Sequence, residues 1–438
     1  MGIENNDLTN TFVKNVRNKE KSIAIVGLGY VGLPLALTFA ENNFSVVGID
    51  IDLVKISKLN NKQSYLKHIN RTRIQKVIDS KKLIPTSDFS LVESCFAIIL
   101  CVPTPLNKNR EPDLYYIKTT LNSLKSFLKK GQLLSLESTT YPGTTEEVIM
   151  SQLISLGFEI GKDFFLVYSP EREDPGNKEF TTSSIPKVIG GITENCKEMG
   201  IELYSKIIKK LVPVSSTRAA ETTKLLENIH RAVNIGLVNE LKILSDKMDI
   251  DIYEIINAAA TKPFGFTAYY PGPGLGGHCI PIDPFYLTWK AREYGMNTKF
   301  IELAGEINAS MPMYVVEKIF NALNDINKAI KDSKILVLGL SYKKNIDDIR
   351  ESPSLEIIDH LLKKGANIKY NDPYIPKMPK VRKYTLEVKS IEITANSLSL
   401  FDCVLLLTDH DTFPYEMIRK NSKLIIDTRG RFSASKNI

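Results

Sequence analysis

SIAIVGLGYVGLPLALTFAENNFSVVGID, residues 22–50, has the clearest pattern of secondary structure in the sequence. It opens with a short apolar run, 22–26, that is typical of a buried strand. A glycine-rich turn follows at once, then a helix-like segment over 33–43 and a second apolar run over 44–50. The order strand, glycine turn, helix, strand predicts a βαβ unit.

Gly27, Gly29 and Gly32 in that turn have the spacing GxGxxG. In such a turn the first glycine permits a tight bend, the second lets the backbone approach a pyrophosphate, and the third lets the helix pack closely. Asp50 ends the second strand, where a carboxylate accepts hydrogen bonds from ribose hydroxyls and repels a 2′-phosphate. The stretch predicts binding of NAD rather than NADP; the alternative is an ordinary turn with incidental glycines.

Strand-like runs and helical stretches alternate beyond this unit, which predicts a parallel, doubly wound sheet up to about residue 212. The alternation restarts near residue 334 and predicts a second, smaller α/β unit. The later runs of the first unit are 97–102, 133–137 and 165–167; those of the second are 334–340, 366–373, 403–410 and 423–430. The predicted fold class is therefore α/β, with two Rossmann-like parallel-sheet domains joined by a helical region.

A long helical stretch without proline, 217–248, lies between the two units. Helices of this length often bridge domains or dimerise. Its apolar residues recur every three or four positions: Leu226, Ile229, Val233, Leu237, Leu241, Leu244 and Met248. More helical material follows to about residue 330, interrupted by a Gly/Pro-rich loop at 262–284.

The chain of 438 residues has room for about three domains. The expected division is a polar, frayed tail over 1–20, an NAD-binding domain over 21–212, a central helical and dimerisation domain over 213–330, and an α/β domain over 331–438.

The formal charge is small, 57 basic minus 50 acidic residues or +7, and the lysine pairs are scattered. This disfavours nucleic acid as a partner and suits an anionic small molecule. No apolar run approaches the ~18–20 residues that span a bilayer. Five cysteines, without a CxxC pair, argue against disulfides or zinc and predict a cytoplasmic protein.

A second glycine-rich segment, 270–283, contains Cys279 and ends at Asp283. Its glycines allow the backbone to approach a ligand closely, and a thiol in that position is a candidate nucleophile. The alternative is a buried, inert cysteine. His278 is adjacent, but neighbouring side chains usually diverge, so we do not pair it with Cys279.

Lys224 and Asn228 are spaced i, i+4 on the long helix, away from its apolar stripe. Such a pair could donate hydrogen bonds to a developing oxyanion; the alternative is a solvated face. Glu171 follows a predicted strand, where open α/β sheets bind ligands. It could act as a base or orient water, or form a loop salt bridge.

A series of blocks then resembles the UDP-glucose/GDP-mannose dehydrogenase family over about residues 21 to 432. In order they are VGLGYVGLPLA, CVPTP, ESTTYPGTT, YSPERE, KLLEN, PGPGLGGHCIPIDP and GLSYKKNIDDIRESP. The resemblance implies oxidation of the C6 hydroxymethyl of a sugar nucleotide to a carboxylate, with two NAD accepting four electrons. It also implies a homodimer or higher homo-oligomer, no metal, and an active site between the two α/β units.

The resemblance implies a role for each matching residue. Cys279 forms a thiohemiacetal and then a thioester, and Asp283 assists proton transfer and hydrolysis. Lys224 and Asn228 stabilise the oxyanion. The remaining implied catalytic residues, which orient water and move protons, are Thr140 and Glu171.

The resemblance further implies two sets of binding residues. Those for the cofactor are Gly27, Gly29, Tyr30, Val31, Gly32, Asp50, Thr104 and Arg350. Those for the UDP-sugar are Lys224, Asn228, Tyr269, Gly276 and Lys343.

The loops around the glycine segment distinguish the sugars. UDP-glucose members usually have a Lys where Ile282 stands, and an Arg where Pro263 stands beside Lys262. Mannosamine-type members have PERVLPG and HPR, which do not occur here. PEREDPGN and TKPFGFTAYYPGPGLGG are similar to UDP-N-acetylglucosamine 6-dehydrogenases of surface polysaccharide synthesis. UDP-N-acetylmannosamine, UDP-N-acetylgalactosamine and UDP-glucose stay open.

Two other classes of protein are alternatives to a nucleotide-sugar dehydrogenase. A non-catalytic sugar-nucleotide-binding protein on the same fold would be favoured by loss of Cys279 or Lys224, and both are present. A two-electron hydroxyacid dehydrogenase needs no cysteine at a glycine loop, so the loop that contains Cys279 counts against that class.

Overall fold

The computed structural model describes residues 7–66, 69–107, 109, 111–172, 180–277, 282–379, 381, 383–384 and 386–432. The chain forms two compact units. Unit 1 comprises Met1–Glu227 and Phe285–Gly295, and unit 2 comprises Asn228–Pro284 and Met296–Ile438. The four-part division expected above stays a prediction.

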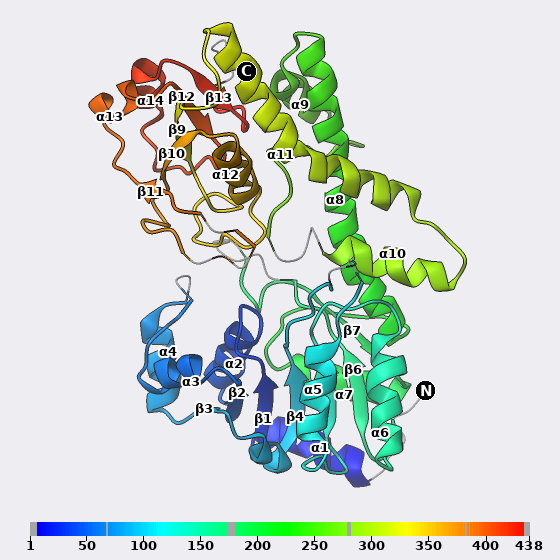
Figure 1. The fold of residues 1–438 in the computed structure, drawn as a ribbon. Helices are drawn as coiled ribbons and strands as arrows, with labels where there is room; N and C mark the ends of the chain where they lie inside the picture. Colours follow the sequence, from blue (N-terminus) through cyan, green and yellow to red (C-terminus); the bar gives the residue numbers. More distant parts are fainter. Residues whose placement is uncertain are drawn as a thin grey trace. The chain divides into compact units, whose positions relative to one another are not determined.

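Unit 1 is built on an eight-stranded sheet, in the order β3-β2-β1-β4-β5-β6-β7-β8 (Figure 1). All pairs are parallel except β6 with β7. The strands are β1 (Ser22–Val26), β2 (Val46–Ile49), β3 (Leu83–Thr86), β4 (Cys95–Leu100), β5 (Leu133–Leu136), β6 (Phe165–Tyr168), β7 (Lys187–Gly191) and β8 (Leu211–Pro213). The central strands are buried on both faces, which is why their sequences are continuously apolar.

Helices cover this sheet. They are α1 (Asp7–Asn18), α2 (Gly32–Glu41), α3 (Leu53–Asn60), α4 (Arg71–Asp79), α5 (Tyr115–Leu124), α6 (Ser151–Ser155) and α7 (Glu194–Tyr204). Two short helices, η1 (Phe89–Ser94) and η2 (Thr145–Met150), also belong to unit 1.

The N-terminal segment corrects one expectation. Residues 1–20 were expected to be a polar, frayed tail, but 7–18 form α1. Phe12 and Val16, one helical turn apart, are fully buried. The Phe12 ring lies edge-on to Phe96, 5.3 Å away, and to Phe165, 5.7 Å away. Apolar residues at helical spacing, with Val13 packed beside them, dock this mostly polar helix on the core.

Unit 2 contains a five-stranded parallel sheet in the order β11-β10-β9-β12-β13. The strands are β9 (Lys334–Leu338), β10 (Asn367–Asn371), β11 (Lys389–Ser390), β12 (Cys403–Leu406) and β13 (Ile425–Asp427). Its helices are α9 (Ile252–Ala260), α11 (Lys299–Asp325), α12 (Pro353–Lys363), α13 (Ala395–Ser399) and α14 (Tyr415–Asn421). Ser352 caps α12 and Pro353 is its first residue, a position where proline's missing N–H costs no helical hydrogen bond.

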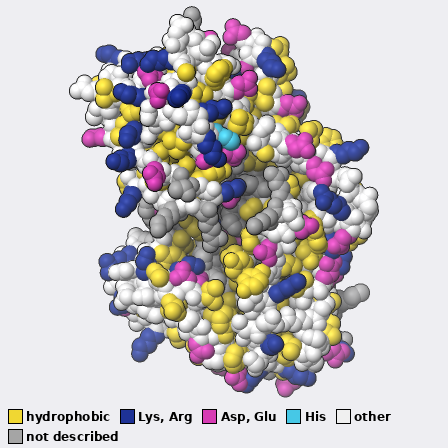
Figure 2. Space-filling model, viewed as in Figure 1, with side chains coloured by type: hydrophobic (Ala, Val, Ile, Leu, Met, Phe, Trp, Pro, Cys, Tyr) yellow, Lys and Arg dark blue, Asp and Glu magenta, His cyan; other side chains and the backbone are white. Residues whose placement is uncertain are grey.

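Two helices run from one unit into the other: α8 (Thr217–Lys247) and α10 (Asp283–Glu293). The α/β class, with two sheets separated in sequence by long helices, is thus confirmed. Basic and acidic side chains are interspersed on the face drawn in Figure 2, which is typical of a solvated surface.

The apolar stripe of α8 is largely exposed. Ile229 is buried, but Leu237, Leu241 and Leu244 are 52%, 38% and 51% exposed. Helix α8 instead turns Leu225, Ala232 and Val238 inward.

Candidate active site

The glycine turn after β1 has the shape that a dinucleotide pyrophosphate needs. Gly27 has φ +93°, and a Cβ there would lie 2.6 Å from the Cys101 carbonyl oxygen. A Cβ on Gly32 would lie 1.9 Å from the Gly27 oxygen, whereas one on Gly29 would meet nothing within 4 Å. The first and third glycines are therefore required by packing, and the second leaves open space at the start of α2.

Asp50 stands at the end of β2 beside this turn. Its buried carboxylate accepts hydrogen bonds from the backbone N–H groups of Leu28 and Asp52, both at 2.9 Å. Lys55 Nζ also lies 2.9 Å from it. These contacts fix the carboxylate beside the glycine turn.

The other expected cofactor residues of unit 1 lie at neighbouring loops. Val31 is the N-cap of α2, and Tyr30 precedes it. The buried Thr104, after β4, donates a hydrogen bond from Oγ1 to the Thr139 carbonyl at 2.7 Å. Tyr286 on α10 donates to the carbonyl of Thr104 at 2.7 Å, so α10 packs on the same loop.

Unit 1 brings together Lys224, Glu171 and the segment after β5. Lys224 is buried on α8, and its ammonium donates to the Glu171 carbonyl at 2.5 Å. Arg172, the next residue, donates to Glu227 on α8. A solvated face is therefore the wrong interpretation for Lys224.

Thr140 is fully buried just after β5. Its Oγ1 has no hydrogen-bond partner among the residues that the structure describes. Because buried hydroxyls are normally satisfied, this one suits a water molecule or a ligand atom.

A buried ion pair supports the same region and was not predicted. Lys187 Nζ lies 2.6 Å from a carboxylate oxygen of Glu137, and the Tyr204 hydroxyl donates to the other oxygen at 2.6 Å. Burial raises the pKa of Glu137 despite the lowering effect of Lys187. A pocket beside Glu171 is lined by both members of the pair and by Val31. An acidic residue ending an apolar strand was the available sign of this buried polar group.

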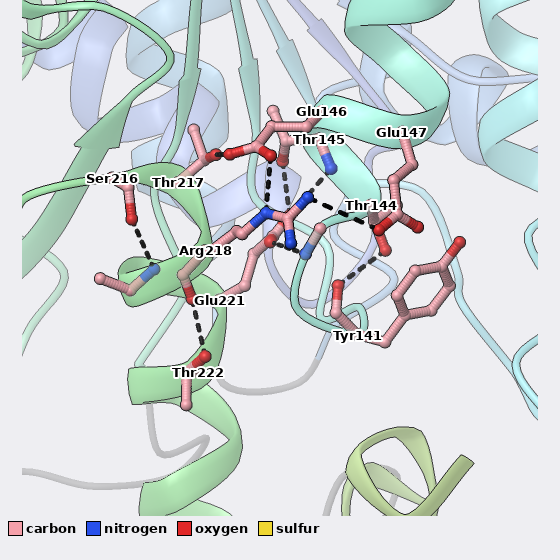
Figure 3. Close-up of polar contacts among 12 residues, drawn as sticks. Tyr141, Thr144, Thr145, Glu146, Glu147, Ser216, Thr217, Arg218, Glu221 and Thr222 are labelled. Atoms are coloured by element: carbon pink, nitrogen blue, oxygen red, sulfur yellow. Dashed lines mark hydrogen bonds and ion pairs between the residues drawn. The ribbon is translucent and has the colours of Figure 1, made fainter. Parts of the chain in front are cut away.

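Glu221, one turn before Lys224 on α8, was also missed. Its fully buried carboxylate accepts hydrogen bonds from the backbone N–H of Gly143 at 2.6 Å and of Thr145 at 2.9 Å, and from Thr145 Oγ1 at 2.7 Å (Figure 3). In the same view Arg218 pairs with Glu146 at 2.6 Å. These contacts fasten the start of α8 to the turn that follows Thr140.

Glu221 should make stability depend on pH. Burial raises its pKa from 4.5 to about 7, against the lowering effect of its hydrogen bonds. A raised pKa contributes stability that is present below the unfolded pKa and is lost as pH rises through the folded pKa. At about 1.4 kcal/mol per pKa unit, the loss between pH 4.5 and 7 is about 3 kcal/mol. Glu221→Gln cannot ionise and should lack this loss, which urea unfolding at several pH values would measure.

The matched control for that measurement is Glu240→Gln, an exposed glutamate of the same helix. It should keep the wild-type pH dependence. If Glu221→Gln keeps it too, the buried carboxyl does not titrate in this range.

Unit 2 contains two more of the expected catalytic residues, Asn228 and Asp283. The Asn228 amide donates to the Asp283 carboxylate, and both side chains are buried. Asn228 lies one turn after Lys224 on α8, and Asp283 begins α10. His278 and Cys279 lie outside the described residues.

The glycine loop packs against the block that contains Lys343. The N–H of Gly277 donates to the Arg350 carbonyl at 3.0 Å. A Cβ on Gly276 would lie 2.5 Å from the Tyr342 Cβ. The sequence-predicted residues Gly276, Lys343 and Arg350 are thus neighbours within unit 2.

The remaining expected side chains have definite partners. Arg350 forms an ion pair with Asp348 at 2.6 Å. The Tyr269 hydroxyl lies 3.1 Å from Nδ1 of His230 on α8. Arg429, in the loop after β13, has Nη1 2.8 Å from where a Cβ on Gly272 would stand, and its Nε donates to the Leu407 carbonyl at 2.7 Å.

The described residues contain neither a metal-binding cluster nor a membrane-spanning helix. No group of three His, Cys, Asp or Glu side chains there could hold a metal ion. In the same residues, no helix combines the length and apolar character needed to cross a membrane.

Three domain models of one family match the chain in order: the NAD binding domain over residues 21–208, the central domain over 218–310 and the UDP binding domain over 336–434. The chain belongs to the UDP-glucose/GDP-mannose dehydrogenase family. It is an NAD-dependent nucleotide-sugar 6-dehydrogenase, and the prediction of NAD as cofactor is confirmed. Membership excludes the non-catalytic and hydroxyacid dehydrogenase alternatives.

Relatives of two specificities are similar over nearly the whole chain. UDP-N-acetyl-D-glucosamine 6-dehydrogenase of Pseudomonas aeruginosa is 34% identical over 92% of this chain and 95% of its own. UDP-N-acetyl-D-mannosamine dehydrogenase of Methanococcus vannielii is 33% identical over 95% and 94%. The solved UDP-D-ManNAc dehydrogenase of Pyrococcus horikoshii, 32% identical, superposes with a TM-score of 0.83 over 93% of this chain and 95% of that one.

Proposed function

We propose that the enzyme oxidises the C6 hydroxymethyl group of UDP-N-acetylglucosamine to the uronic acid, in the cytoplasm, for surface polysaccharide biosynthesis. Two sets of buried polar groups support this proposal: Lys224 and Thr140 in unit 1, and the Asn228–Asp283 pair in unit 2. Burial of a lysine, of an amide–carboxylate pair and of a hydroxyl without a partner among the described residues lowers the stability of the fold. Such groups are typical of a catalytic centre.

The proposed chemistry has two oxidation stages. Bound NAD accepts one hydride in each stage. Between them the Cys279 thiolate adds to the aldehyde carbon to give a thiohemiacetal, whose oxidation gives a thioester. Water then displaces the thiol. Overall one alcohol, one water and two NAD give one carboxylate, two NADH and three protons.

The residues of the chain have distinct proposed roles in this sequence. The Lys224 ammonium and the Asn228 amide are hydrogen-bond donors, and each stabilises the negative charge on the substrate oxygen in the tetrahedral intermediates. Asp283, held by Asn228, exchanges protons with the reacting groups. Thr140 and Glu171 orient the hydrolytic water.

Further proposed UDP-sugar contacts, besides Lys224 and Asn228, come from unit 2. Lys343 and Arg429 are cations suited to a diphosphate, and Tyr269 and Gly276 flank the sugar. Arg350 is a proposed cofactor-binding residue. Support comes from the packing of Gly276 on Tyr342, which places the glycine loop beside the Lys343 loop.

The choice of sugar rests on residue types. Ile282 and Pro263 differ from the Lys and Arg of UDP-glucose enzymes, and the mannosamine-type blocks do not occur. UDP-N-acetylmannosamine is the second candidate, because relatives named for the two sugars are 33–34% identical to this chain.

A panel of UDP-sugars would test the choice. Initial rates of NADH formation would be compared for UDP-GlcNAc, UDP-ManNAc, UDP-GalNAc and UDP-glucose. The proposal expects the highest kcat/KM for UDP-GlcNAc. A higher kcat/KM for UDP-ManNAc would make UDP-N-acetylmannosamine, and not UDP-N-acetylglucosamine, the preferred substrate.

We further propose that two copies of the chain associate through the exposed face of α8. Leu237, Leu241 and Leu244 lie at i, i+4 and i+7, on one face of the helix. A row of half-exposed leucines on a long helix is typical of a surface that a partner covers. A second copy offers the identical row, which is self-complementary in a two-fold dimer.

Charge on this face should separate the subunits. We expect the double variant Leu237→Asp/Leu241→Asp to have half the oligomer mass of the wild type. Light scattering after size-exclusion chromatography would measure this mass. Glu254→Ala, at an exposed position of α9, is the control and should keep the wild-type mass. A monomeric wild type at micromolar concentration, or an unchanged double variant, would exclude this interface.

A further inference from the structure

His410 is a fully buried histidine of unit 2 that no proposed step uses. It follows β12, and its ring is packed between the rings of Tyr374, 4.9 Å away, and Phe413, 5.4 Å away. A buried imidazole must satisfy both nitrogens, so its contacts define its role.

The two ring nitrogens have different partners. Nδ1 accepts a hydrogen bond from the backbone N–H of Asn345 at 2.9 Å. Nε2 lies 3.1 Å from the Asp372 carboxylate and 3.2 Å from Ser341 Oγ. Because a backbone N–H can only donate, Nδ1 carries no proton, and the proton is on Nε2.

This arrangement of Ser341, His410 and Asp372 is not a nucleophilic triad. In a triad the acid and the hydroxyl face opposite nitrogens of the imidazole. Here both face Nε2, and the other nitrogen is occupied by Asn345. The Ser341 hydroxyl in turn donates to the Lys343 carbonyl at 2.9 Å.

Asp372 does not need His410 to be satisfied. One carboxylate oxygen accepts the backbone N–H of Leu340 at 2.7 Å, and the other accepts that of Tyr374 at 2.8 Å. Burial opposes ionisation, but the hydrogen bond from His410 and these backbone donors together lower the pKa of Asp372. Replacing His410 therefore leaves a carboxylate that still has partners.

The contacts of His410 bracket the Lys343 loop. One nitrogen faces Ser341 and the other holds Asn345, so the ring ties the two sides of the loop together. The Asn345 side chain adds a hydrogen bond to Asp411 at 2.6 Å, directly after His410. Between the ties lie Lys343 and Tyr342, and Tyr342 packs against Gly276 and Gly277.

We propose that His410 is a positioning residue for the UDP-sugar, acting by fixing the loop that carries Lys343 and Tyr342. The inference rests on the proposed function, in which Lys343 contacts the UDP-sugar. The decisive contact is the one between Nδ1 and the Asn345 N–H, because it closes the loop.

Two substitutions separate the contacts of the ring. The amide of Asn is short and can place its oxygen where Nδ1 stands, whereas the amide of Gln reaches the place of Nε2. His410→Gln should raise KM for the UDP-sugar about tenfold, the effect of one lost hydrogen bond, while KM for NAD stays within about twofold. His410→Asn should remain close to wild type in both constants.

Calorimetric titration with UDP alone gives the same comparison without turnover. His360→Gln, a half-exposed histidine on α12, is the control and should bind UDP like wild type. Equal weakening by His410→Gln and His410→Asn, or unchanged UDP binding in His410→Gln, would overturn the inference.

Lys343→Ala separates this inference from the function on which it rests. If Lys343→Ala weakens UDP binding and His410→Gln does not, only the positioning role fails. If Lys343→Ala binds UDP like wild type, the proposed role of Lys343 itself fails.

Discussion

Cys279→Ser should stop turnover, with NADH formation falling by about 10⁴-fold or more, the scale seen when a covalent nucleophile is removed. A serine hydroxyl at neutral pH is protonated and cannot capture the aldehyde as a thiolate does. Binding of NAD and of the UDP-sugar should persist, because neither depends on the thiol. Steady-state NADH absorbance and a titration with UDP would measure the two effects.

Cys95→Ser is the matched control. Burial raises the pKa of Cys95 to about 12, so this thiol is not a nucleophile at neutral pH. Its Sγ donates to the Leu91 carbonyl, a hydrogen bond that serine can keep. Normal turnover is expected for Cys95→Ser. Normal turnover in Cys279→Ser would remove the covalent step from the mechanism.

Lys224→Met should lower kcat by about 10²–10³-fold, the range for removal of one donor to an oxyanion. Methionine keeps the length and the apolar stem of the side chain but has no ammonium. The buried position of Lys224 makes the loss larger than at a solvated site, because no water can replace the donor. The measurement is kcat and KM with both substrates varied.

Lys247→Met, at an exposed position of the same helix, controls for the loss of one positive charge. Its kinetic constants should match those of wild type. A Lys224→Met enzyme with a normal kcat and a raised KM would mean that Lys224 binds the substrate and does not stabilise the oxyanion.

Much of the fold could be predicted because local chemistry determines it. The GxGxxG turn can bend only with glycine at Gly27, and the long helix lacks any proline or glycine pair to end it before residue 247. Strand β7 was missed because KVIGG is short and ends in two glycines. Helix α1 was missed because few of its residues are apolar, and Phe12 is decisive only through its distant partners Phe96 and Phe165.

The candidate site was less predictable, because its contacts join distant segments. Lys224 and Glu171 are separated by 53 positions, and only the fold brings them together. Glu221 did leave a sign in the sequence, since it lies three residues before Lys224 and so shares its face of the helix. His410 left none, because a histidine after a strand is equally compatible with a surface loop.

The NADH yield per UDP-sugar distinguishes a four-electron oxidation from a two-electron oxidation. With the sugar nucleotide limiting and NAD in excess, the reaction is followed to completion by absorbance. A four-electron oxidation predicts about two NADH for each UDP-sugar consumed, since each hydride carries two electrons. A yield of about one, with the aldehyde as product, would contradict it.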